Sequence, residues 1–272
     1  MNKEIKFESP TFFKRIKGML GVDFYRLFHT PMFYIFLAVA AIIPAMILGM
    51  TNMETAEGVT KLYTNTWQIV AANEPLYVVN SIAEYANMNM VFIFGGIMVS
   101  IFIGHDYKSG YVKQLFTTHA KKQDYMISKS LVGAFSMACM CITYLIGGVL
   151  AGALTQASFA VNAGSLIIAL LSKIVLSLGW ASLYTFLNVI FRKFFGISIA
   201  SSFFFGTGIL IIGAAAIVGN SSILNIFLYG SSVYACLSSN ILTLVVCVIV
   251  SVVWAIIYNV LGTLLLTKSD VY

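Results

Sequence analysis

The sequence predicts an all-α polytopic membrane protein, and three observations support this fold class. Of its 272 residues, 60% are hydrophobic and only 10% are charged, and the mean hydropathy is +0.92. A soluble domain of ordinary composition carries about a quarter charged residues. Several apolar runs are long enough to cross a bilayer, and nearly all Lys and Arg residues lie on one side of those runs. We therefore expect one transmembrane domain over residues 1–272.

Six apolar runs are expected to form transmembrane helices, because crossing about 30 Å of hydrocarbon takes roughly 20 mostly apolar residues. They cover approximately 31–50, 88–104, 130–154, 170–191, 196–218 and 242–266. A transmembrane barrel would show alternating segments of about ten residues instead. Thr30 is expected to cap the first span and Pro31 to start it, because proline at the first helical position loses no hydrogen bond. Pro44 inside this span is expected to kink it.

The basic residues predict the orientation of the spans. Of the 16 Lys and Arg residues, 14 fall before the first span, between the second and third, between the fourth and fifth, or after the last. They are Lys3, Lys6, Lys14, Arg15, Lys17, Arg26, Lys108, Lys113, Lys121, Lys122, Lys129, Arg192, Lys193 and Lys268. The positive-inside rule then places both termini in the cytoplasm. The outer loop 51–87 contains Trp67, Lys61 and four acids, and we expect a small helical cap there.

Several function classes lack the residues they need. A net charge of +6 spread over the chain does not form the basic stripe of a nucleic-acid binder. The four cysteines are too few and too scattered for a disulfide framework, and Cys139 and Cys141 do not form a CxxC pair for a metal. No H-E-x-x-H, G-x-S-x-G or G-x-x-x-x-G-K-[ST] motif occurs. We expect no catalytic residues, no metal site and no bound cofactor in this chain.

Two cytoplasmic segments are predicted to form amphipathic helices. Within residues 10–30, Phe12, Ile16, Leu20, Phe24 and Leu27 share one helical face, which is typical of a helix lying in the headgroup plane. This helix could also be a plain basic anchor. The loop 105–129 is longer than a simple turn, and its interior predicts a short helix over 111–117 after Gly110. The apolar side chains Val112, Leu115 and Phe116 beside Lys113 suit docking into a cleft of another protein, although the loop could also be simply solvated.

The loop 105–129 carries a resemblance to a known family. An acid, a glycine four residues later and a lysine three residues after it are followed by a short helix, a basic pair, Tyr and Lys before the next span. This pattern resembles the first cytoplasmic loop of type-2 ABC exporter permeases, which usually have Glu at the first position. The matching residues here are Asp106, Gly110, Lys113, Lys121, Lys122, Tyr125 and Lys129. The segment from Asp23 to Tyr34 and the expected six spans with cytoplasmic termini resemble the same family.

The resemblance implies a permease subunit that works with two ABC ATPase subunits and with a second permease, either a copy of this chain or a different one. ATP and Mg²⁺ would bind to the ATPase partner. The residues implied to couple the two are Asp106, Gly110, Tyr111, Val112, Lys113, Leu115, Phe116, Lys121 and Lys122, with a second, shorter contact at Arg192 and Lys193. A bacterial plasma membrane is the location that the family implies.

A translocation path is expected to be lined by uncharged or aromatic side chains, because the spans are nearly free of ionisable groups. The candidates are Tyr144, Tyr184, Asn188, Asn259 and Lys173, and each of the first four could instead join helices within the subunit. Lys173 could also extend to the outer interface. Such a wall suits an apolar or amphipathic cargo, such as an antimicrobial peptide or a drug. A secondary transporter of three plus three spans or a non-transporting membrane scaffold are the alternatives. Gly95-Gly96 and Gly147-Gly148 predict close helix packing.

Overall fold

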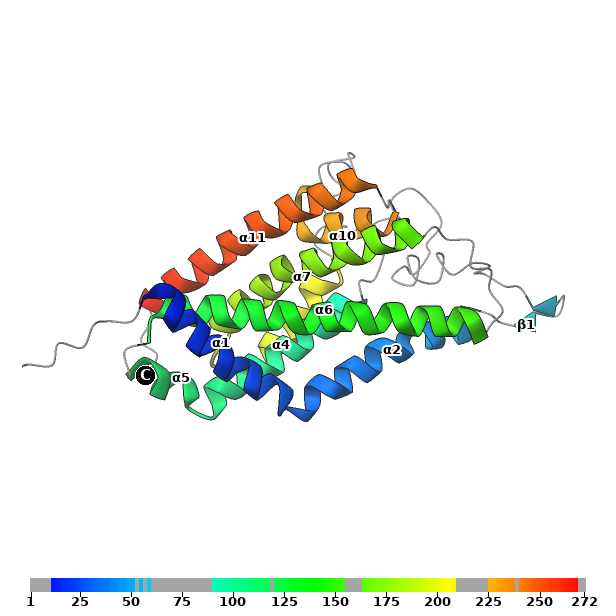
Figure 1. The fold of residues 1–272 in the computed structure, drawn as a ribbon. Coiled ribbons are helices and arrows are strands. Elements are labelled where there is room, and N and C mark those ends of the chain that lie inside the picture. Colours follow the sequence, from blue (N-terminus) through cyan, green and yellow to red (C-terminus); the bar gives the residue numbers. More distant parts are fainter. Residues whose placement is uncertain are drawn as a thin grey trace, which may run out of the picture.

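A computed structural model of the chain describes residues 11–51, 54–55, 58–59, 90–117, 120–154, 163–208, 225–237 and 240–268. These residues form a helical bundle, apart from one antiparallel pairing of two-residue strands (Figure 1). The elements are α1 (Phe12–Phe28), α2 (Pro31–Thr51), β1 (Glu54–Thr55), β2 (Gly58–Val59), α4 (Met90–Lys108), α5 (Tyr111–Thr117), α6 (Lys122–Leu154), α7 (Ala163–Ile190), α8 (Phe195–Gly206), α10 (Leu228–Leu237) and α11 (Ile241–Lys268). The expected all-α class is confirmed.

The helices are those of a protein embedded in a membrane. Within the described ranges, four helices are long and apolar enough to cross a bilayer, namely α4, α6, α7 and α11. A fifth is present if α1 and α2 count together as one span bent by 67°. The run expected over 196–218 contains α8, which has only 12 residues, and its remainder lies mostly outside the described residues. Six spans and cytoplasmic termini therefore stay predictions. Most of the expected outer loop 51–87 also lies outside the described part of the chain.

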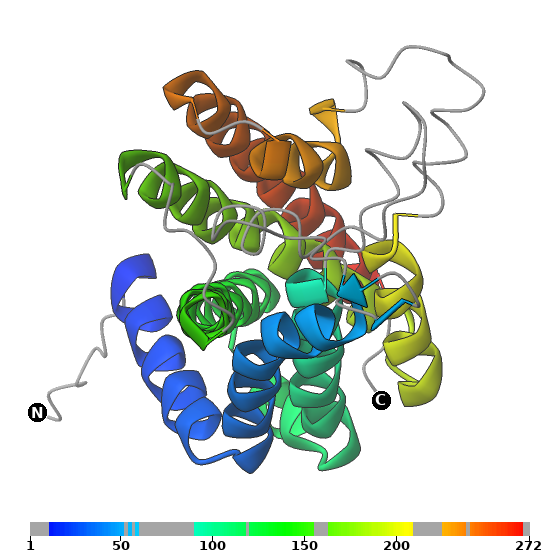
Figure 2. The same cartoon turned by 90° about the vertical axis from the view of Figure 1, so that its right-hand side faces the viewer.

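The longest helix, α6, lies between two groups of helices. Figure 2 shows it nearly end-on, with α1 and α2 on one side and α7 on the other. Helix α7 then packs against α11, α10, α4 and α8. At one end of the bundle, the starts of α1 and α6 meet α5 and the last turn of α11. The segments that the sequence assigns to the cytoplasm thus gather at this end, which we call the basic end.

Stacked aromatic rings fill the centre of the bundle. Trp180 of α7 stacks on Phe92 of α4 and on Tyr184 one turn away, with ring centroids 5.6 and 5.5 Å apart. All three side chains are buried. The Trp180 indole donates a hydrogen bond to Ser232 Oγ at 2.9 Å, so its polar atom has a partner in the apolar interior. These rings join α4, α7 and α10.

Glycines allow the close helix packing that the sequence predicts. A Cβ atom on Gly147 of α6 would lie 2.0 Å from the carbonyl oxygen of Ala41 in α2, so the two backbones touch at this point. A Cβ atom on Gly96 of α4 would lie 2.6 Å from the ring of Tyr184. Any larger residue at either position would push neighbouring helices apart. The small-residue prediction is confirmed at both sites.

The chain turns sharply between α1 and α2, and this turn differs from the expectation in one detail. Helix α2 begins at Pro31 as predicted. However, the Thr30 hydroxyl donates a hydrogen bond to the carbonyl oxygen of Arg26 at 2.7 Å and does not cap α2. At this position the side chain can reach the unpaired carbonyl at the end of α1, because residues four apart lie on one helix face. Thr30 therefore closes the end of α1.

One helix of the structure lies outside the six expected spans. The connection between the runs 196–218 and 242–266 contains the ten-residue helix α10. Its Leu228, Tyr229 and Val233 side chains are buried in the core. The serines Ser231 and Ser232 bond to backbone carbonyl oxygens of Asn225 and Leu228, so they do not break the helix. Serines are common in loops, but here they belong to a helix whose apolar face packs on α7 and α11.

We predict that Gly147→Ala destabilises the protein by about 1–3 kcal/mol, because the added methyl group meets the backbone of α2. Gly18→Ala in α1 is the matched control, since nothing lies within 4 Å of its added Cβ. The control is expected to raise stability by about 0.5–1 kcal/mol. Unfolding in detergent, followed by circular dichroism, measures both. Equal effects of the two substitutions would contradict the close approach of α2 and α6.

Candidate functional site

The short helix α5 lies at the basic end with its apolar side against the rest of the protein. Gly110, at φ +75°, ends α4 in a left-handed conformation and lets the chain turn into α5. Val112 is buried in a cluster with Tyr125 and Met126 of α6, Val189 of α7 and Leu266 of α11. Leu115 and Phe116 pack at the edge of this cluster. The predicted range 111–117 matches α5, and its apolar side chains contact the protein's own helices.

The opposite side of α5 is polar and open. Lys113, Gln114 and Thr117 are exposed, and so is Lys121 just before α6. Lys122 is different, because its ammonium group donates a hydrogen bond to the carbonyl oxygen of Leu266 at 2.5 Å. This bond ties the start of α6 to the end of α11. The surface that α5 leaves for a partner is therefore polar and basic, and not the apolar face that the sequence suggested for docking.

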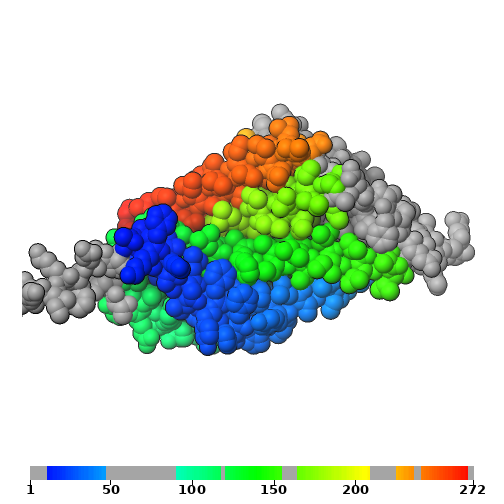
Figure 3. Space-filling view, in the orientation of Figure 1, coloured from blue at the N-terminus to red at the C-terminus, as the bar shows by residue number. Residues whose placement is uncertain are grey.

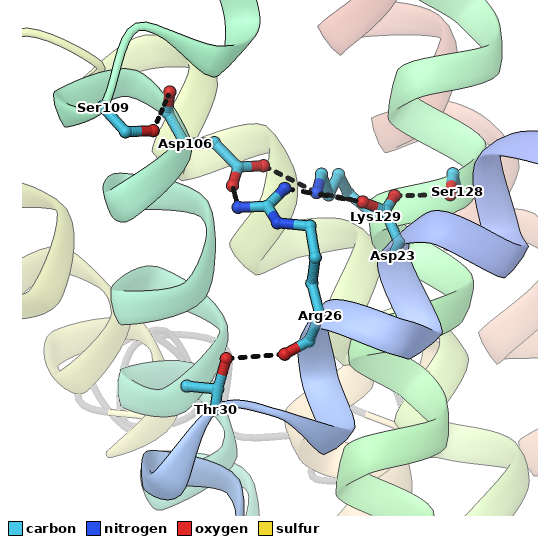
Figure 4. Close-up of polar contacts among 7 residues, drawn as sticks. All are labelled: Asp23, Arg26, Thr30, Asp106, Ser109, Ser128 and Lys129. Atoms are coloured by element: carbon cyan, nitrogen blue, oxygen red, sulfur yellow. Dashed lines mark hydrogen bonds and ion pairs between the residues drawn. The ribbon is translucent and has the colours of Figure 1, made fainter.

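Four charged side chains meet beneath α5, and we call Asp23, Arg26, Asp106 and Lys129 the charge quartet. Figure 4 shows how they converge from three helices: α1, α4 and α6. Lys129 Nζ lies 2.6 Å from Asp23 Oδ1 and 2.6 Å from Asp106 Oδ2. Arg26 forms an ion pair with Asp106, and its Nη1 atom lies 3.8 Å from Asp23 Oδ1. Ser128 Oγ donates a further hydrogen bond to Asp23 at 2.7 Å.

The charge quartet is almost closed to solvent. The side chains of Asp23, Asp106 and Lys129 are 1%, 0% and 0% exposed, while that of Arg26 is 24% exposed. Two acids face two bases, so the group carries no formal net charge. A buried charge is tolerated when it is paired and hydrogen-bonded. The quartet therefore fixes α1, α4 and α6 to one another at this end.

Aromatic rings enclose the two bases, and one of these rings belongs to α5. The Arg26 guanidinium lies 4.3 Å from the ring centroid of Tyr111 and 5.6 Å from that of Phe102. Lys129 Nζ lies 4.6 Å from the Phe102 centroid and 5.7 Å from that of Tyr111. Burial raises the pKa of the Tyr111 phenol, and the negative charge of Asp23 raises it further. Tyr111 stays neutral and links α5 to the quartet through cation–π contacts.

A second ion pair fastens the start of α1. Arg15 Nε donates a hydrogen bond to Asp124 Oδ2 at 2.7 Å, and the Asp124 side chain is only 2% exposed. This pair joins the first turn of α6 to α1. Figure 3 shows α1 in blue across the surface at the end where α11, in red, terminates. The expected helix over 10–30 is confirmed as α1, but its polar residues Arg15, Asp23 and Arg26 hold it to the bundle.

The expected path residues occupy different places. Tyr144, Tyr184, Asn188 and Lys173 are buried within the bundle. Lys173 Nζ lies 5.6 Å from the ring centroid of Tyr144, so helices of the same chain enclose this lysine. Asn188 donates hydrogen bonds to Ser100 Oγ and to the Tyr184 carbonyl and accepts one from Ser198 at 2.6 Å. The hydrogen bonds of Asn188 join α7 to α4 and α8.

Asn259 differs from the other path residues, because it borders an apolar groove. This groove has a volume of about 420 Å³ and lies between α6 and α11, with Leu178 of α7 contributing to its wall. Asn259 Nδ2 donates a hydrogen bond to Ser182 at 3.1 Å, and its oxygen accepts one from Ser130 at 3.1 Å. The remaining wall is mostly aliphatic, with Ile127, Leu131, Val252, Ile256, Val260 and Leu264.

Arg192 and Lys193 lie at a separate polar pocket of about 270 Å³. The pocket is formed by the ends of α4 and α7 and the start of α8, and Lys108 is a third base in its wall. It is distinct from the exposed face of α5. The structure thus brings Asp106, Tyr111 and Val112 together at one site, while Arg192 and Lys193 belong to another.

Comparison with known proteins supplies no relative for this chain. No protein-family model matches the sequence, and no curated protein matches it. Within the described residues, His, Cys, Asp and Glu nowhere form a group of three or more that could hold a metal ion.

The charge quartet was not predicted from the sequence, where Arg26 and Lys129 mark the cytoplasmic side and Asp23 begins a segment that resembles the permease family. The i, i+3 spacing of Asp23 and Arg26 places both on one face of α1. That pair of opposite charges on an otherwise apolar face was the available signal. Its partners Asp106 and Lys129 lie about a hundred residues further along the chain, and only the tertiary structure shows that the four meet.

We predict that Lys129→Met destabilises the protein by about 3–5 kcal/mol, because it leaves Asp23 and Asp106 buried without their shared partner. Lys17→Met, at an exposed position of α1, is the control and should change stability by less than about 0.5 kcal/mol. Chemical unfolding in detergent measures both. The double variant Lys129→Met/Asp106→Asn should lose less than the sum of its two single variants. Strict additivity would contradict the buried pairing.

Proposed function

We propose that this chain is the permease subunit of an ATP-driven ABC transporter, and that α5 is the helix on which the ATPase acts. One observation carries this proposal. A short helix at the basic end has a polar outer face, while Val112 and Tyr111 on its inner side touch α6, α7, α11 and the charge quartet. A push on α5 from outside would therefore reach five helices at once.

The charge quartet supplies the stiffness that such a role requires. Tyr111 contacts Arg26 of α1 and Lys129 of α6, and both bases pair with Asp106 of α4. Buried ion pairs resist separation, because parting them would leave charges unpaired in a medium of low polarity. A displacement of α5 would move α1, α4 and α6 together as a unit. Gly110 provides the turn about which α5 can shift relative to α4.

The wider assembly follows from this proposal. The chain would cross a bacterial plasma membrane six times with both termini in the cytoplasm, and α8 with the residues after it would form the fifth span. It would pair with a second permease, identical or different, and with two ATPase subunits. Because the chain contains no Walker motif, ATP and Mg²⁺ would bind to those partner subunits.

For the cargo, we propose export of an apolar or amphipathic compound, such as an antimicrobial peptide or a drug. The groove between α6 and α11 supports this choice, because its wall is aliphatic apart from Gln123, Ser130, Asn259 and Thr263. Its volume of about 420 Å³ is in the range that accommodates a small ligand or one part of a larger one. Neutral polar groups in such a wall can orient a cargo without binding a charge.

A secondary transporter is the second candidate, and one observation favours it. Lys173 is buried against Tyr144 within the membrane-spanning part of α7, and ionisable residues in such places often serve proton or ion coupling. A non-transporting scaffold is the remaining alternative. Transport that continues without ATP and stops with Lys173→Met would favour the secondary transporter. A stoichiometric ATPase in the purified complex would favour the permease.

We predict that Lys113→Glu/Gln114→Glu reduces copurification of the ATPase by at least about tenfold, since both side chains face outward from α5 and the substitution reverses the charge there. Tagged full-length chain is purified from the organism that encodes it, and the bound ATPase is quantified by mass spectrometry. Thermal unfolding should remain unchanged, because exposed side chains contribute little to stability.

The matched control is Lys14→Glu/Lys17→Glu, which reverses two exposed charges on α1 at the same end of the bundle. This variant should retain the ATPase. If both double variants lose it equally, the contact is a general effect of charge, and α5 has no special role. If neither loses it, α5 does not receive the ATPase.

The cargo proposal predicts that Val260→Trp blocks transport, because the larger ring would fill the groove. Leu261→Trp is the control, since Leu261 is a neighbouring exposed residue of α11 outside the groove wall. Binding of a dansyl-labelled cationic amphipathic peptide to the purified protein, measured by fluorescence, should weaken at least about tenfold in the first variant only. Unchanged binding in Val260→Trp would exclude the groove as the cargo site.

A further inference from the structure

The polar pocket between α4, α7 and α8 differs in its charge from the apolar groove between α6 and α11. Lys108 ends α4, Arg192 and Lys193 follow α7, and all three line a space of about 270 Å³. None of the residues in its wall is an acid. We call it the basic pocket. Its positive charge favours a ligand with a compact negative group.

The acid closest in sequence faces away from the basic pocket. Asp106 is two residues from Lys108, and residues two apart lie on nearly opposite sides of a helix. Gly104, Tyr107 and Lys108 share the face of α4 that lines the pocket, whereas Asp106 pairs with Arg26 and Lys129 on the other side. The carboxylate of Asp106 is therefore directed at the charge quartet, and Asp106 is not part of the pocket wall.

The inner wall of the basic pocket is polar and rigid. Asn188 and Ser198 are each 2% exposed, and Ser198 donates a hydrogen bond to the Asn188 oxygen at 2.6 Å. The Asn188 amide donates in turn to Ser100 Oγ at 3.0 Å and to the Tyr184 carbonyl at 2.8 Å. This chain of hydrogen bonds holds the wall in place. A ligand would meet a prepared polar surface with bases around it.

Exposed apolar side chains adjoin the turn that contributes Arg192 and Lys193 to the basic pocket, and one of them, Phe195, is part of its wall. Ile190, Phe194, Phe195 and Ile197 are between 44% and 61% exposed, and they lie immediately before, within or after the turn that carries Arg192 and Lys193. This turn is at the end of an apolar helix long enough to cross the membrane. Bases beside exposed aromatic and aliphatic groups at that depth are typical of the boundary between lipid headgroups and acyl chains.

We propose that the basic pocket binds the phosphate group of an anionic phospholipid. The guanidinium of Arg192 can bind two phosphate oxygens at once, and the ammonium groups of Lys108 and Lys193 add point charges. The acyl chains would lie along Phe194, Phe195 and Ile197. Basic pockets between transmembrane helices at the cytoplasmic surface bind anionic headgroups in this manner. This inference goes beyond the proposed transport function and does not require an ATPase.

The test uses the purified full-length chain in nanodiscs of phosphatidylcholine with or without phosphatidylglycerol. Native mass spectrometry after release into detergent counts the lipid retained by each protein molecule. We expect the wild-type chain to retain phosphatidylglycerol at least about tenfold more tightly than phosphatidylcholine, since the pocket has three bases and each base near an anionic headgroup contributes a factor of about five. Arg192→Gln/Lys193→Gln should abolish most of this preference. The preference should also decrease at high salt.

The control variant Lys113→Gln/Lys121→Gln removes two exposed bases at the same end of the bundle but outside the basic pocket. It should keep the wild-type preference. An equal loss in both variants would overturn the proposal, because the lipid would then respond to overall charge. Thermal unfolding in phosphatidylcholine alone verifies that each variant is folded. The single variant Lys193→Gln, at an exposed position, replaces the double variant if that one unfolds.

Two further arms separate this lipid from other negative ligands. Inorganic phosphate at millimolar concentration is added to the protein in neutral detergent, and thermal stabilisation is compared with that by short-chain phosphatidylglycerol. Stabilisation by phosphate equal to that by the lipid would overturn the lipid assignment in favour of a soluble anion. If Arg192→Gln/Lys193→Gln instead loses the ATPase and keeps its lipid preference, the bases form a protein contact and the proposal is wrong.

Discussion

The pairing of Lys129 with Asp23 and Asp106 is the interaction on which the basic end of the molecule depends. One buried ammonium group lies 2.6 Å from a carboxylate of α1 and 2.6 Å from a carboxylate of α4. Each of the three charges would be costly to bury alone, by several kcal/mol for each ion. None can leave without exposing the others to that cost. The three helices that carry them are therefore held in one arrangement at the basic end.

The position of α5 depends in turn on this arrangement of α1, α4 and α6. Tyr111 fits over Arg26 and Lys129 only while those bases are held by the two acids, and Val112 enters a cluster built from α6, α7 and α11. Further from this end, the helices are joined by neutral bonds such as those from Trp180 to Ser232 and from the Gly179 amide to Ser251 Oγ. Hydrogen bonds of this kind contribute on the order of 1 kcal/mol each. The helices are thus joined by buried charges at the basic end and by neutral hydrogen bonds and apolar packing along the rest of the bundle.

The parts of the fold that the sequence predicts are those set by local signals. Pro31 starts α2, and Gly110 separates α4 from α5, because each has a backbone preference that acts at its own position. The glycine pairs predict close packing but not the partner, which for Gly147 is the backbone of Ala41. The charge quartet and the burial of Lys173 against Tyr144 escape prediction, because they depend on which helices become neighbours. Helix α10 was missed because its serines resemble a polar loop in composition, although they bond to the backbone carbonyl oxygens of Asn225 and Leu228.

Helix α7 contributes to the walls of both cavities and extends to the basic end of the bundle. Leu178 contributes to the apolar groove, and Asn188, ten residues later, lines the basic pocket about 15 Å further along the helix. Between them Trp180 and Tyr184 are completely enclosed, so α7 cannot rotate without disturbing α4 and α10. At its end Val189 belongs to the same buried cluster as Val112 of α5. Helix α7 therefore links α5 to the walls of both cavities, because Leu178 and Asn188 belong to the same helix as Val189.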